Sequence, residues 1–387
     1  MDCDQLKAIL NRGEDSKHQF KADFKSIDKL AVEISAFTNS DGGIIIIGVS
    51  DACELIGVSK KDINRLNQQI SNATTNKIDK QIFVKTEIIV CDDKRILIIL
   101  VPRGSNKPYA VNRVDVWVKS GADKRRAPIE EILRLAQSSG FLYADESETE
   151  TSVKDIDLDF FKARYHSFYQ EQIERLEIPI ENLFVNIKLM KDDKLTLAGL
   201  LLFGKNPEFV KPQFGIKATY FEGCEISGQR YKDSENIRGK LIDQYLDGIY
   251  FIKRNLRRIQ GNQNFNAPGM LEIPEETFSE IIANAIVHRN YYMDSSIQIN
   301  LFDDRLEINS PGNLPNTINE ENIKFGVHIE RNPIILYFLE KDTKFRYSGK
   351  GTGIPRVIKL CEEAGIKIKL TDDRQKQQFS VIFYRRR

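Results

Sequence analysis

The chain has 387 residues, of which 41% are hydrophobic and 29% are charged, and its formal net charge at pH 7 is +1. At about 100–200 residues per domain this length predicts two or three domains, and the composition is typical of a soluble globular protein with sizeable cores. A net charge near zero excludes a global field that attracts nucleic acid, so any such binding requires a local basic patch.

The amino terminus and the apolar runs argue against export or membrane insertion. The terminus, MDCDQLKAIL, is acidic and short of apolar side chains, unlike a signal peptide. The longest apolar runs, 44–47, 96–101 and 197–203, are far shorter than the roughly 20 residues of a membrane helix. The five cysteines lie far apart without CxxC spacing, which predicts reduced thiols rather than a disulfide framework or a zinc site. We therefore expect a cytoplasmic protein that does not contact membranes.

Helix and strand signals alternate over residues 1–145. Asp28 is a candidate cap for a helix over 29–37. Asp92-Asp93 is the predicted turn of a hairpin, and Pro128 favours the first turn of a later helix. Three β-runs are predicted in this part of the chain, at residues 44–49, 95–101 and 114–119.

A polar, acidic stretch without aromatic residues, 144–157, is the best candidate for a linker. We therefore expect a first domain, a linker, a middle region that packs on the last domain, and that last domain, with the boundaries 1–145, 146–157, 158–262 and 263–387. In the last two parts, the patterns predict helices over 158–175 and 231–258 and strands over 194–203 and 379–384.

Residues 199–205 match the letters of a phosphate-binding loop, GxxxxGK, but lack its chemistry. The interior, 200–203, is apolar and is predicted to be a buried strand, which cannot turn backbone N–H groups toward a phosphate. Asn206 stands where a serine or threonine would reach magnesium. We expect no phosphate-binding loop here, and we find no other motor motif that would indicate a true helicase.

A candidate catalytic pair lies on a helix predicted after residue 274. Glu280 and Asn284 are four residues apart, which places them one turn apart on the same side of the helix. A carboxylate and an amide in this arrangement can hold Mg²⁺ and a water, and the carboxylate can act as general base on a water that attacks a phosphate. On spacing alone, an amphipathic helix with two exposed polar residues is the commoner interpretation.

An ordered set of segments accompanies this pair: 283–285, 288–291, 304–308, 310–315, 331–333 and 349–354. The set resembles a bacterial family often labelled as ATP-binding proteins, transcriptional regulators or RecG-related helicases. The end of that family resembles the Bergerat-type (GHKL) α/β sandwich, the ATPase fold of gyrase B, Hsp90, histidine kinases and MutL. The resemblance implies that Glu280 is the general base and that Asn284 binds Mg²⁺. It also implies contacts to ATP from Asn284, Gly312, Gly349, Gly351, Thr352 and Gly353, whose glycines let backbone N–H groups approach phosphates.

The resemblance is incomplete at the position that recognises adenine. That fold uses an aspartate, in an Asp-x-Gly-x-Gly context, to accept a hydrogen bond from the adenine amino group. Here the corresponding stretch is 310–314, Ser-Pro-Gly-Asn-Leu, so Ser310 replaces the carboxylate and one glycine remains. Asp303 and Asp304 are the nearest substitutes, but both lie in a predicted hairpin turn.

A second set of segments lies in the first domain, at residues 14–21, 34–43, 48–51, 107–109 and 116–121. It resembles the α+β AlbA-like domain also found in Schlafen proteins, which implies nucleic-acid binding. Some Schlafen relatives cleave structured RNA with clustered carboxylates, which hold the metal ion that activates water. Glu14 and Asp51 match two of those carboxylates, but Gln19 stands where the other belongs.

Basic residues of this domain offer contacts to phosphates that do not read sequence. The candidates are Lys21, Lys119, Lys124, Arg125 and Arg126. Trp117 and Tyr109 can stack on bases if exposed, although buried aromatic residues are commoner. A solvated charged face is an equally good interpretation of the same residues.

The sequence thus predicts an α/β and α+β multidomain protein with an AlbA/Schlafen-like first domain and a Bergerat-type last domain. The functional hypothesis is an ATP-binding, nucleic-acid-associated regulator or defence factor with weak ATPase activity. Its expected cofactors are ATP and Mg²⁺, and its expected partners are DNA or RNA and further copies of itself. Two alternatives remain: a metal-dependent Schlafen-like RNase using Glu14 and Asp51, and a non-enzymatic oligomeric scaffold with a decayed ATP site.

Overall fold

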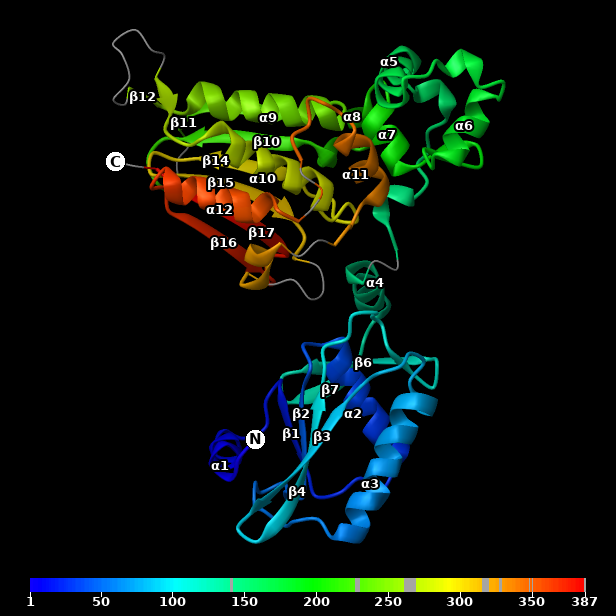
Figure 1. The fold of residues 1–387 in the computed structure, drawn as a ribbon, viewed down its shortest axis with the longest axis vertical. Coiled ribbons are helices and arrows are strands. Elements are labelled where there is room, and N and C mark those ends of the chain that lie inside the picture. Colours follow the sequence, from blue (N-terminus) through cyan, green and yellow to red (C-terminus); the bar gives the residue numbers. More distant parts are fainter. Residues whose placement is uncertain are drawn as a thin grey trace. The chain divides into compact units, whose positions relative to one another are not determined.

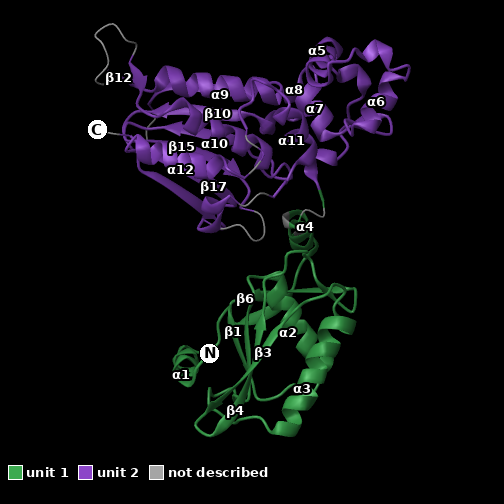
Figure 2. Cartoon of the chain, in the orientation of Figure 1, with its two compact units in different colours: residues 1–142 green, residues 143–387 purple. Residues whose placement is uncertain are grey.

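The computed structural model describes residues 1–139, 142–226, 230–260, 269–314, 320–326, 329–347, 349 and 351–385. The chain divides into two compact units, residues 1–142 and 143–387, coloured green and purple in Figure 2. None of the helices described here is long and apolar enough to cross a membrane.

Unit 1 is built around a four-stranded sheet in the order β1-β2-β4-β3, in which β1 is parallel to β2 and the other neighbours are antiparallel. Its strands are β1 (His18–Lys21), β2 (Gly43–Ile47), β3 (Lys85–Cys91) and β4 (Lys94–Val101). A smaller antiparallel sheet contains β5 (Ala110–Val111), β6 (Asp115–Ser120) and β7 (Asp123–Arg126). The helices are α1 (Cys3–Arg12), α2 (Ile27–Asn39), α3 (Lys60–Asn72), α4 (Ile129–Ser138) and a π-helical turn, Ala73–Lys77.

The four-stranded sheet is covered on both faces, with α1 on one and α2 and α3 on the other (Figure 1). Ile46 packs with Leu6 of α1, whereas its neighbours Ile45 and Ile47 pack with Ile34 of α2. Burial on both faces explains the continuous apolar run of β2, because successive side chains of a strand point to opposite sides.

Helix α2 connects the two sheets of unit 1. Its cap is Ser26, whose hydroxyl accepts from the backbone N–H of Lys29, so the predicted cap Asp28 lies inside the first turn. At the other end, the buried side chain of Asn39 donates to the carbonyls of Tyr109 and Trp117, at 2.9 Å each. These bonds hold the small sheet against α2.

Cys3 and Cys91 form a disulfide that joins α1 to the end of β3. The prediction of reduced thiols is therefore wrong for this pair, because packing of α1 on the sheet brings together two residues that are 88 positions apart. Cys53, Cys224 and Cys361 are free thiols.

Unit 2 has a six-stranded sheet in the order β11-β10-β14-β15-β17-β16, in which β10 and β14 are parallel and the other neighbours antiparallel. The strands are β10 (Ile216–Phe221), β11 (Tyr231–Ile237), β14 (Ile297–Leu301), β15 (Arg305–Pro311), β16 (Ile368–Asp373) and β17 (Gln378–Tyr384). Three helices lie along the sheet in a second layer (Figure 1): α9 (Leu241–Asn255), α10 (Glu275–His288) and α12 (Gly353–Glu363).

The alternation of apolar and polar residues explains the two layers. Ile299 and Ile308, which face each other on β14 and β15, pack with the helices in one continuous core, together with Ile282 of α10. The neighbouring pair, Asn300 and Glu307, points to the other face of the sheet.

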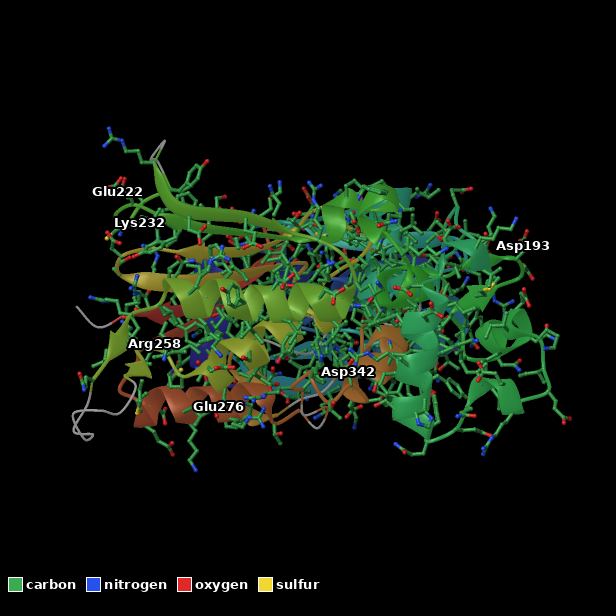
Figure 3. The ribbon with its side chains drawn as sticks, turned by 90° about the horizontal axis from the view of Figure 1, so that it is seen from above. Asp193, Glu222, Lys232, Arg258, Glu276 and Asp342 are labelled. Carbon is green, nitrogen blue, oxygen red and sulfur yellow. A yellow bond between two sulfur atoms is a disulfide. The ribbon has the colours of Figure 1, made fainter. Side chains whose placement is uncertain are left out.

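The remaining elements of unit 2 are short: α5 (Leu158–Tyr169), α6 (Ile180–Asn186), β8 (Met190–Lys191), β9 (Lys194–Leu195), α7 (Leu197–Phe203), α8 (Pro207–Val210), β12 (Arg258–Ile259), β13 (Met270–Leu271), α11 (Pro333–Glu340) and 3₁₀ turns at Ala144–Glu146, Val153–Asp155, Ile173–Arg175, Pro212–Phe214 and Asn322–Phe325. Asp342, labelled in Figure 3, follows α11 and forms an ion pair of 2.8 Å with Arg164 of α5. This pair links α5 to the end of α11, and Phe161 of α5 packs in the hydrophobic core of the unit.

Residues 146–157, predicted to be a linker, are packed into unit 2. Just before them, Asp145 is buried, and its Oδ2 accepts from the backbone N–H groups of Ile334 and Ile335 at 2.7 and 3.1 Å. Further on, the N–H of Thr149 donates to a carbonyl of β9 at 2.8 Å. The prediction is wrong because these polar groups form internal hydrogen bonds, which composition alone does not reveal.

Two predicted elements change type in the structure. The strand predicted over 194–203 is mostly helix α7, because the Thr196 hydroxyl accepts from the N–H of Gly199 at 3.1 Å and caps a helix there. Every residue of α7 is buried, so the run shows no helical periodicity. The helix predicted over 231–258 begins instead with edge strand β11, and the helix predicted over 158–175 ends at Tyr169.

Candidate functional site

A cavity in unit 2 lies between α10, strands β15 and β17, and the segments that precede α11 and α12. Its volume is about 90 Å³, below the roughly 300–1,000 Å³ of typical ligand pockets, so a nucleotide-sized ligand extends beyond it. Most of the wall is apolar: Ile281, Ile308, Leu314, Ile323, Ile329, Phe379 and Val381. Polar groups come from α10, from β15 and from the loops: Glu280, Asn284, His288, Ser310, Asn313, Arg331 and Tyr347.

The structure brings the predicted pair on α10 together at this cavity. Asn284 Nδ2 donates to Glu280 Oε1 at 3.1 Å, which leaves the amide oxygen as the atom that suits a cation. Glu280 is only 1% exposed, and Arg356 of α12 donates to its Oε2. Burial raises the pKa of Glu280, while the guanidinium of Arg356 and the bond from Asn284 oppose that rise.

Glycines bring the segment before α12 close to Glu280. Gly349 and Gly351 have φ angles of 59° and 72°, in the left-handed region that favours glycine. A Cβ on Gly353 would lie 1.9 Å from Glu280 Oε1, so only glycine lets the start of α12 reach the carboxylate. Thr352, exposed, precedes that helix. The predicted glycine-rich segment therefore lies beside the predicted pair.

The other end of the cavity contains Ser310, Gly312 and Arg331. The Ser310 hydroxyl donates to the carbonyl of Ala285 at 3.3 Å. Gly312 has a φ of 100°, and a Cβ there would lie 2.9 Å from Arg331 Nη1. Arg331 donates to the carbonyls of His288 and Asn313 at 3.0 and 2.7 Å, and burial lowers its pKa to about 10.

Asp303 and Asp304, the substitutes considered for the missing aspartate, lie at the turn between β14 and β15. Asp303 accepts from Lys232 Nζ at 2.5 Å and from the N–H of Gly223 at 3.1 Å. Lys232, labelled in Figure 3, marks this end of the sheet. Neither aspartate lines the cavity, where Glu280 is the one carboxylate among the lining residues that the structure describes.

Sequence reasoning missed four polar side chains at this site: His288, Arg331, Tyr347 and Arg356. His288 Nε2 and the Tyr347 hydroxyl are 2.8 Å apart, and burial raises the pKa of Tyr347, which keeps the hydroxyl protonated. His288 and Arg331 belong to the ordered motifs, so their position was a usable signal. Arg356 has no such signal, because 76 residues separate it from Glu280.

In unit 1, neighbouring groups hold the carboxylate of Glu14. Gln19 Nε2 donates to Glu14 Oε1 at 2.5 Å, and the backbone N–H of Phe20 donates to the same atom at 2.6 Å. Lys21 Nζ lies 3.7 Å from that oxygen. The glutamine that replaces a carboxylate thus binds the remaining glutamate directly.

Asp51, the other candidate nuclease residue, is exposed in the turn after β2. Over the described ranges, the one group of three or more side chains close enough to share a metal ion is Cys3, Cys91 and Asp92. Glu14 and Asp51 therefore form no such group, and the disulfide occupies both thiols of the group that does form.

The basic residues predicted to contact nucleic acid all have partners within unit 1. Four form ion pairs: Lys21 with Glu14, Lys124 with Glu33, Arg125 with Glu131 and Arg126 with Asp115. Lys119 donates to Gln19 Oε1 at 2.7 Å, and burial lowers its pKa. The side chains of Arg125 and Arg126 remain 48% and 67% exposed, so phosphates can compete for these two.

The two aromatic candidates differ in exposure. Tyr109 is 5% exposed, which rules out the proposed stacking on bases. Trp117 is partly buried, and the guanidinium of Arg126 lies 5.5 Å from its ring centre. Arg126 and Trp117 are therefore the candidates that remain on the surface of the small sheet.

Residues 14–128 match the family model described as "Schlafen, AlbA_2". Residues 294–383 match the model described as "Putative ATP-dependent DNA helicase recG C-terminal". The chain combines a Schlafen AlbA_2 domain with a domain of the recG C-terminal family. The second match includes β14 to β17 and α12, whereas α10 with Glu280 and Asn284 lies before it. No curated protein matches the chain.

The solved structures that match parts of this chain include the following two. The DIP2311 protein of Corynebacterium diphtheriae has 19% sequence identity and a TM-score of 0.48, with 99% of this chain and 80% of that chain covered. The amino-terminal domain of a RecG-related protein of Nitrosomonas europaea has 17% identity and a TM-score of 0.26, with 33% of this chain and 90% of that chain covered.

Proposed function

We propose that unit 2 binds ATP with Mg²⁺ and hydrolyses it weakly, and that unit 1 associates the protein with nucleic acid. The observation that carries the proposal is the placement of Glu280 and Asn284 beside Gly351 and Gly353 in one cavity with apolar walls. A carboxylate, an amide oxygen and a glycine-rich segment at a helix start are the groups that a Mg²⁺-bound phosphate chain requires. Thr352 and Gly349 belong to the same segment.

The fold supports this assignment of the cavity. One layer of sheet and one layer of helices, with the candidate base on α10 and the glycine-rich segment before α12, is the arrangement expected of a Bergerat-type (GHKL) sandwich. The description of the matching family also names an ATP-dependent protein. These points support ATP over other ligands of similar size.

Mg²⁺ fits the side chains present. Asn284 offers an amide oxygen, a ligand that Mg²⁺ binds together with substrate phosphates and water, and Glu280 offers a carboxylate to a water beside it. Bound Mg²⁺ would neutralise phosphate charge. Glu280 would accept a proton from the attacking water, and its burial, which raises its pKa, makes it a better base than an exposed carboxylate.

Ser310 is the departure that limits adenine recognition. Its hydroxyl already donates to Ala285, so only its lone pairs can accept from an adenine amino group. A neutral hydroxyl accepts a weaker hydrogen bond than a carboxylate does. We therefore expect moderate rather than tight affinity.

Unit 1 would bind DNA or RNA without reading sequence. The support is the Schlafen AlbA_2 match together with the exposed guanidinium groups of Arg125 and Arg126. A protein of this kind suits a role as a regulator or defence factor, in which ATP binding changes nucleic-acid affinity or self-association. We do not propose the RNase alternative, because Glu14 and Asp51 do not come together in a metal-binding group.

The test is calorimetric titration of ATP and Mg²⁺ into the wild type, Asn284→Ala and Gln298→Ala. Gln298 is an exposed polar residue of β14 outside the cavity and serves as the matched control. We expect a dissociation constant on the order of micromolar, weakened at least roughly tenfold by Asn284→Ala alone. Absence of binding to the wild type would refute the proposal and favour the scaffold alternative, which light scattering with and without ATP would then test.

A further inference from the structure

A second, open hollow adjoins the cavity. This groove has a volume of about 540 Å³, and Arg346, Arg356 and Glu276 are among its lining residues. Glu276, labelled in Figure 3, comes from the start of α10. Two residues, Glu280 and Tyr347, line both the groove and the cavity, so the two hollows meet along a shared wall.

The two hollows differ in chemistry and in size. The cavity is mostly apolar and too small for a whole nucleotide, and its Arg331 already donates to two backbone carbonyls. The groove is larger and is lined by the exposed guanidinium groups of Arg346 and Arg356. Apolar walls suit a base, and guanidinium groups bind phosphate oxygens with two parallel hydrogen bonds. The groove also contains the carboxylates of Glu276 and Glu280, and this mixture of charges suits a phosphate chain with its Mg²⁺ better than a bare anion.

Arg356 is placed to respond to a ligand in the groove. Its side chain is 49% exposed, yet its Nη2 donates to Glu280 Oε2, and Glu280 is 1% exposed. A partly exposed guanidinium can rotate, while the buried carboxylate is fixed by packing and by Asn284. An arginine paired with Glu280 also occupies the carboxylate oxygen that would otherwise accept a proton from water.

We propose that the groove is the phosphate subsite of the nucleotide site, and that Arg356 leaves Glu280 for the terminal phosphate of a nucleoside triphosphate. This inference rests on the proposed function and adds the residues that select a triphosphate. The base of a nucleoside monophosphate enters the cavity and the rest of the molecule extends toward the groove, but a single phosphate does not reach Arg356, so the ion pair with Glu280 stays intact. A triphosphate displaces it and leaves Glu280 able to accept a proton. Arg346, which is also exposed and lines the groove, adds a second contact.

The experiment compares the affinities of ATP, ADP and AMP, each with Mg²⁺, for the wild type and a set of variants. For the wild type, we expect ATP to bind most tightly and AMP least tightly. Arg356→Ala is expected to reduce the ratio of ATP to AMP affinity at least roughly tenfold, Arg356→Lys less, and Arg346→Ala less still. Lys359→Ala, a change of an exposed cation on the same helix, is expected to leave the ratio unchanged.

Glu280→Gln supplies a second test that does not remove Arg356. The change weakens the bond that holds Arg356, so ATP is expected to bind more tightly while AMP binding stays the same. Thermal unfolding of each variant checks that it is folded.

The possible failures are distinguishable. If the wild type binds ATP but Arg356→Ala keeps the same ATP-to-AMP ratio, the subsite inference is wrong and the proposed function stands. The same conclusion follows if Glu280→Gln weakens ATP binding. If the wild type binds none of the three nucleotides, the proposed function fails and the inference fails with it.

Discussion

Unit 1 and the cavity of unit 2 contain similar polar residues in different surroundings. In unit 1, Glu14 and Glu33 are each held by side chains of the same unit, with Gln19 on the first and Lys124 on the second. In unit 2, Glu280 also has partners, but it lines a cavity and an open groove. The difference is the space beside the carboxylate: a carboxylate is a candidate for catalysis when a ligand can bind next to it, and a sequence motif alone does not establish this.

Among the variants that test this difference between the units, Gly353→Ala is expected to have the largest effect. The new Cβ would meet the Glu280 carboxylate at 1.9 Å, so α12 or Glu280 must move. We expect loss of ATP binding by roughly a hundredfold or more and a loss of stability of about 1–3 kcal/mol. Calorimetry and thermal unfolding measure the two effects.

Gly248→Ala on α9 is the matched control. A Cβ there lies 3.5 Å from its nearest neighbours, an ordinary contact, and alanine favours the helix. If Gly353→Ala bound ATP as well as this control, the close approach of α12 to Glu280 would not matter for the site.

Reduction of the Cys3–Cys91 disulfide is expected to have the next largest effect, and it should be confined to unit 1. Opening a long loop of this kind lowers stability by about 2–4 kcal/mol. Cys3→Ser should therefore lower the unfolding midpoint of unit 1 and leave ATP affinity unchanged, with Cys224→Ser as the control at an exposed free thiol. Equal midpoints for the two variants under oxidising conditions would show that the bond contributes nothing.

Asp145 of unit 2 extends the comparison to a second buried carboxylate. Backbone N–H groups donate to Asp145, whereas the ammonium group of Lys124 donates to Glu33 of unit 1. Burial raises the pKa of Asp145 to about 6. In the unfolded chain the carboxyl of Asp145 loses its proton at about pH 4, whereas in the folded protein it keeps the proton up to about pH 6. As the pH rises from about 4 to 6, the free energy of unfolding therefore falls by about 2–3 kcal/mol.

Asp145→Asn removes that titration and keeps an oxygen for the same N–H groups. Urea unfolding at pH 4.5 and pH 7 measures the effect. Between these two pH values, Asp145→Asn should lose less stability than the wild type. Asp193→Asn, at an exposed position labelled in Figure 3, should follow the wild type. The same pH dependence in all three proteins would contradict the assignment.

The smallest effect is expected from Arg126→Ala, because its charge is shared with Asp115. If this arginine contacts a phosphate, the slope of log affinity for RNA or DNA against log salt should fall by about 1, with no change in sequence preference. Lys85→Ala, an exposed cation on β3, is the control. Identical slopes for wild type and Arg126→Ala would show that Arg126 does not contact a phosphate of the nucleic acid.

The sequence predicted those parts of the site that depend on local spacing. Glu280 and Asn284 share a helix face because they are four residues apart. Glycine is needed at 351 for its positive φ and at 353 for lack of space, and the spacing of these glycines can be recognised in the sequence. The β4 strand and its hairpin turn at Asp92-Asp93 were likewise predicted, because apolar runs and turn residues act locally.

Features that depend on contacts between distant segments could not be predicted. Arg356 reaches Glu280, and Cys3 reaches Cys91, only after the helices pack on their sheets. Helix α7 was predicted as a strand because complete burial removes periodicity, and the acidic stretch 146–157 was predicted as a linker because its internal hydrogen bonds leave no trace in composition.

Hydrogen–deuterium exchange of the full chain with and without saturating ATP and Mg²⁺ tests the central claim most directly, because it locates the bound ligand. We predict slower exchange in α10 and in residues 351–363, around Glu280 and Arg356, and unchanged exchange in the sheet of unit 1. Unchanged exchange in both of these unit 2 segments would contradict the account, even if ATP bound elsewhere on the protein.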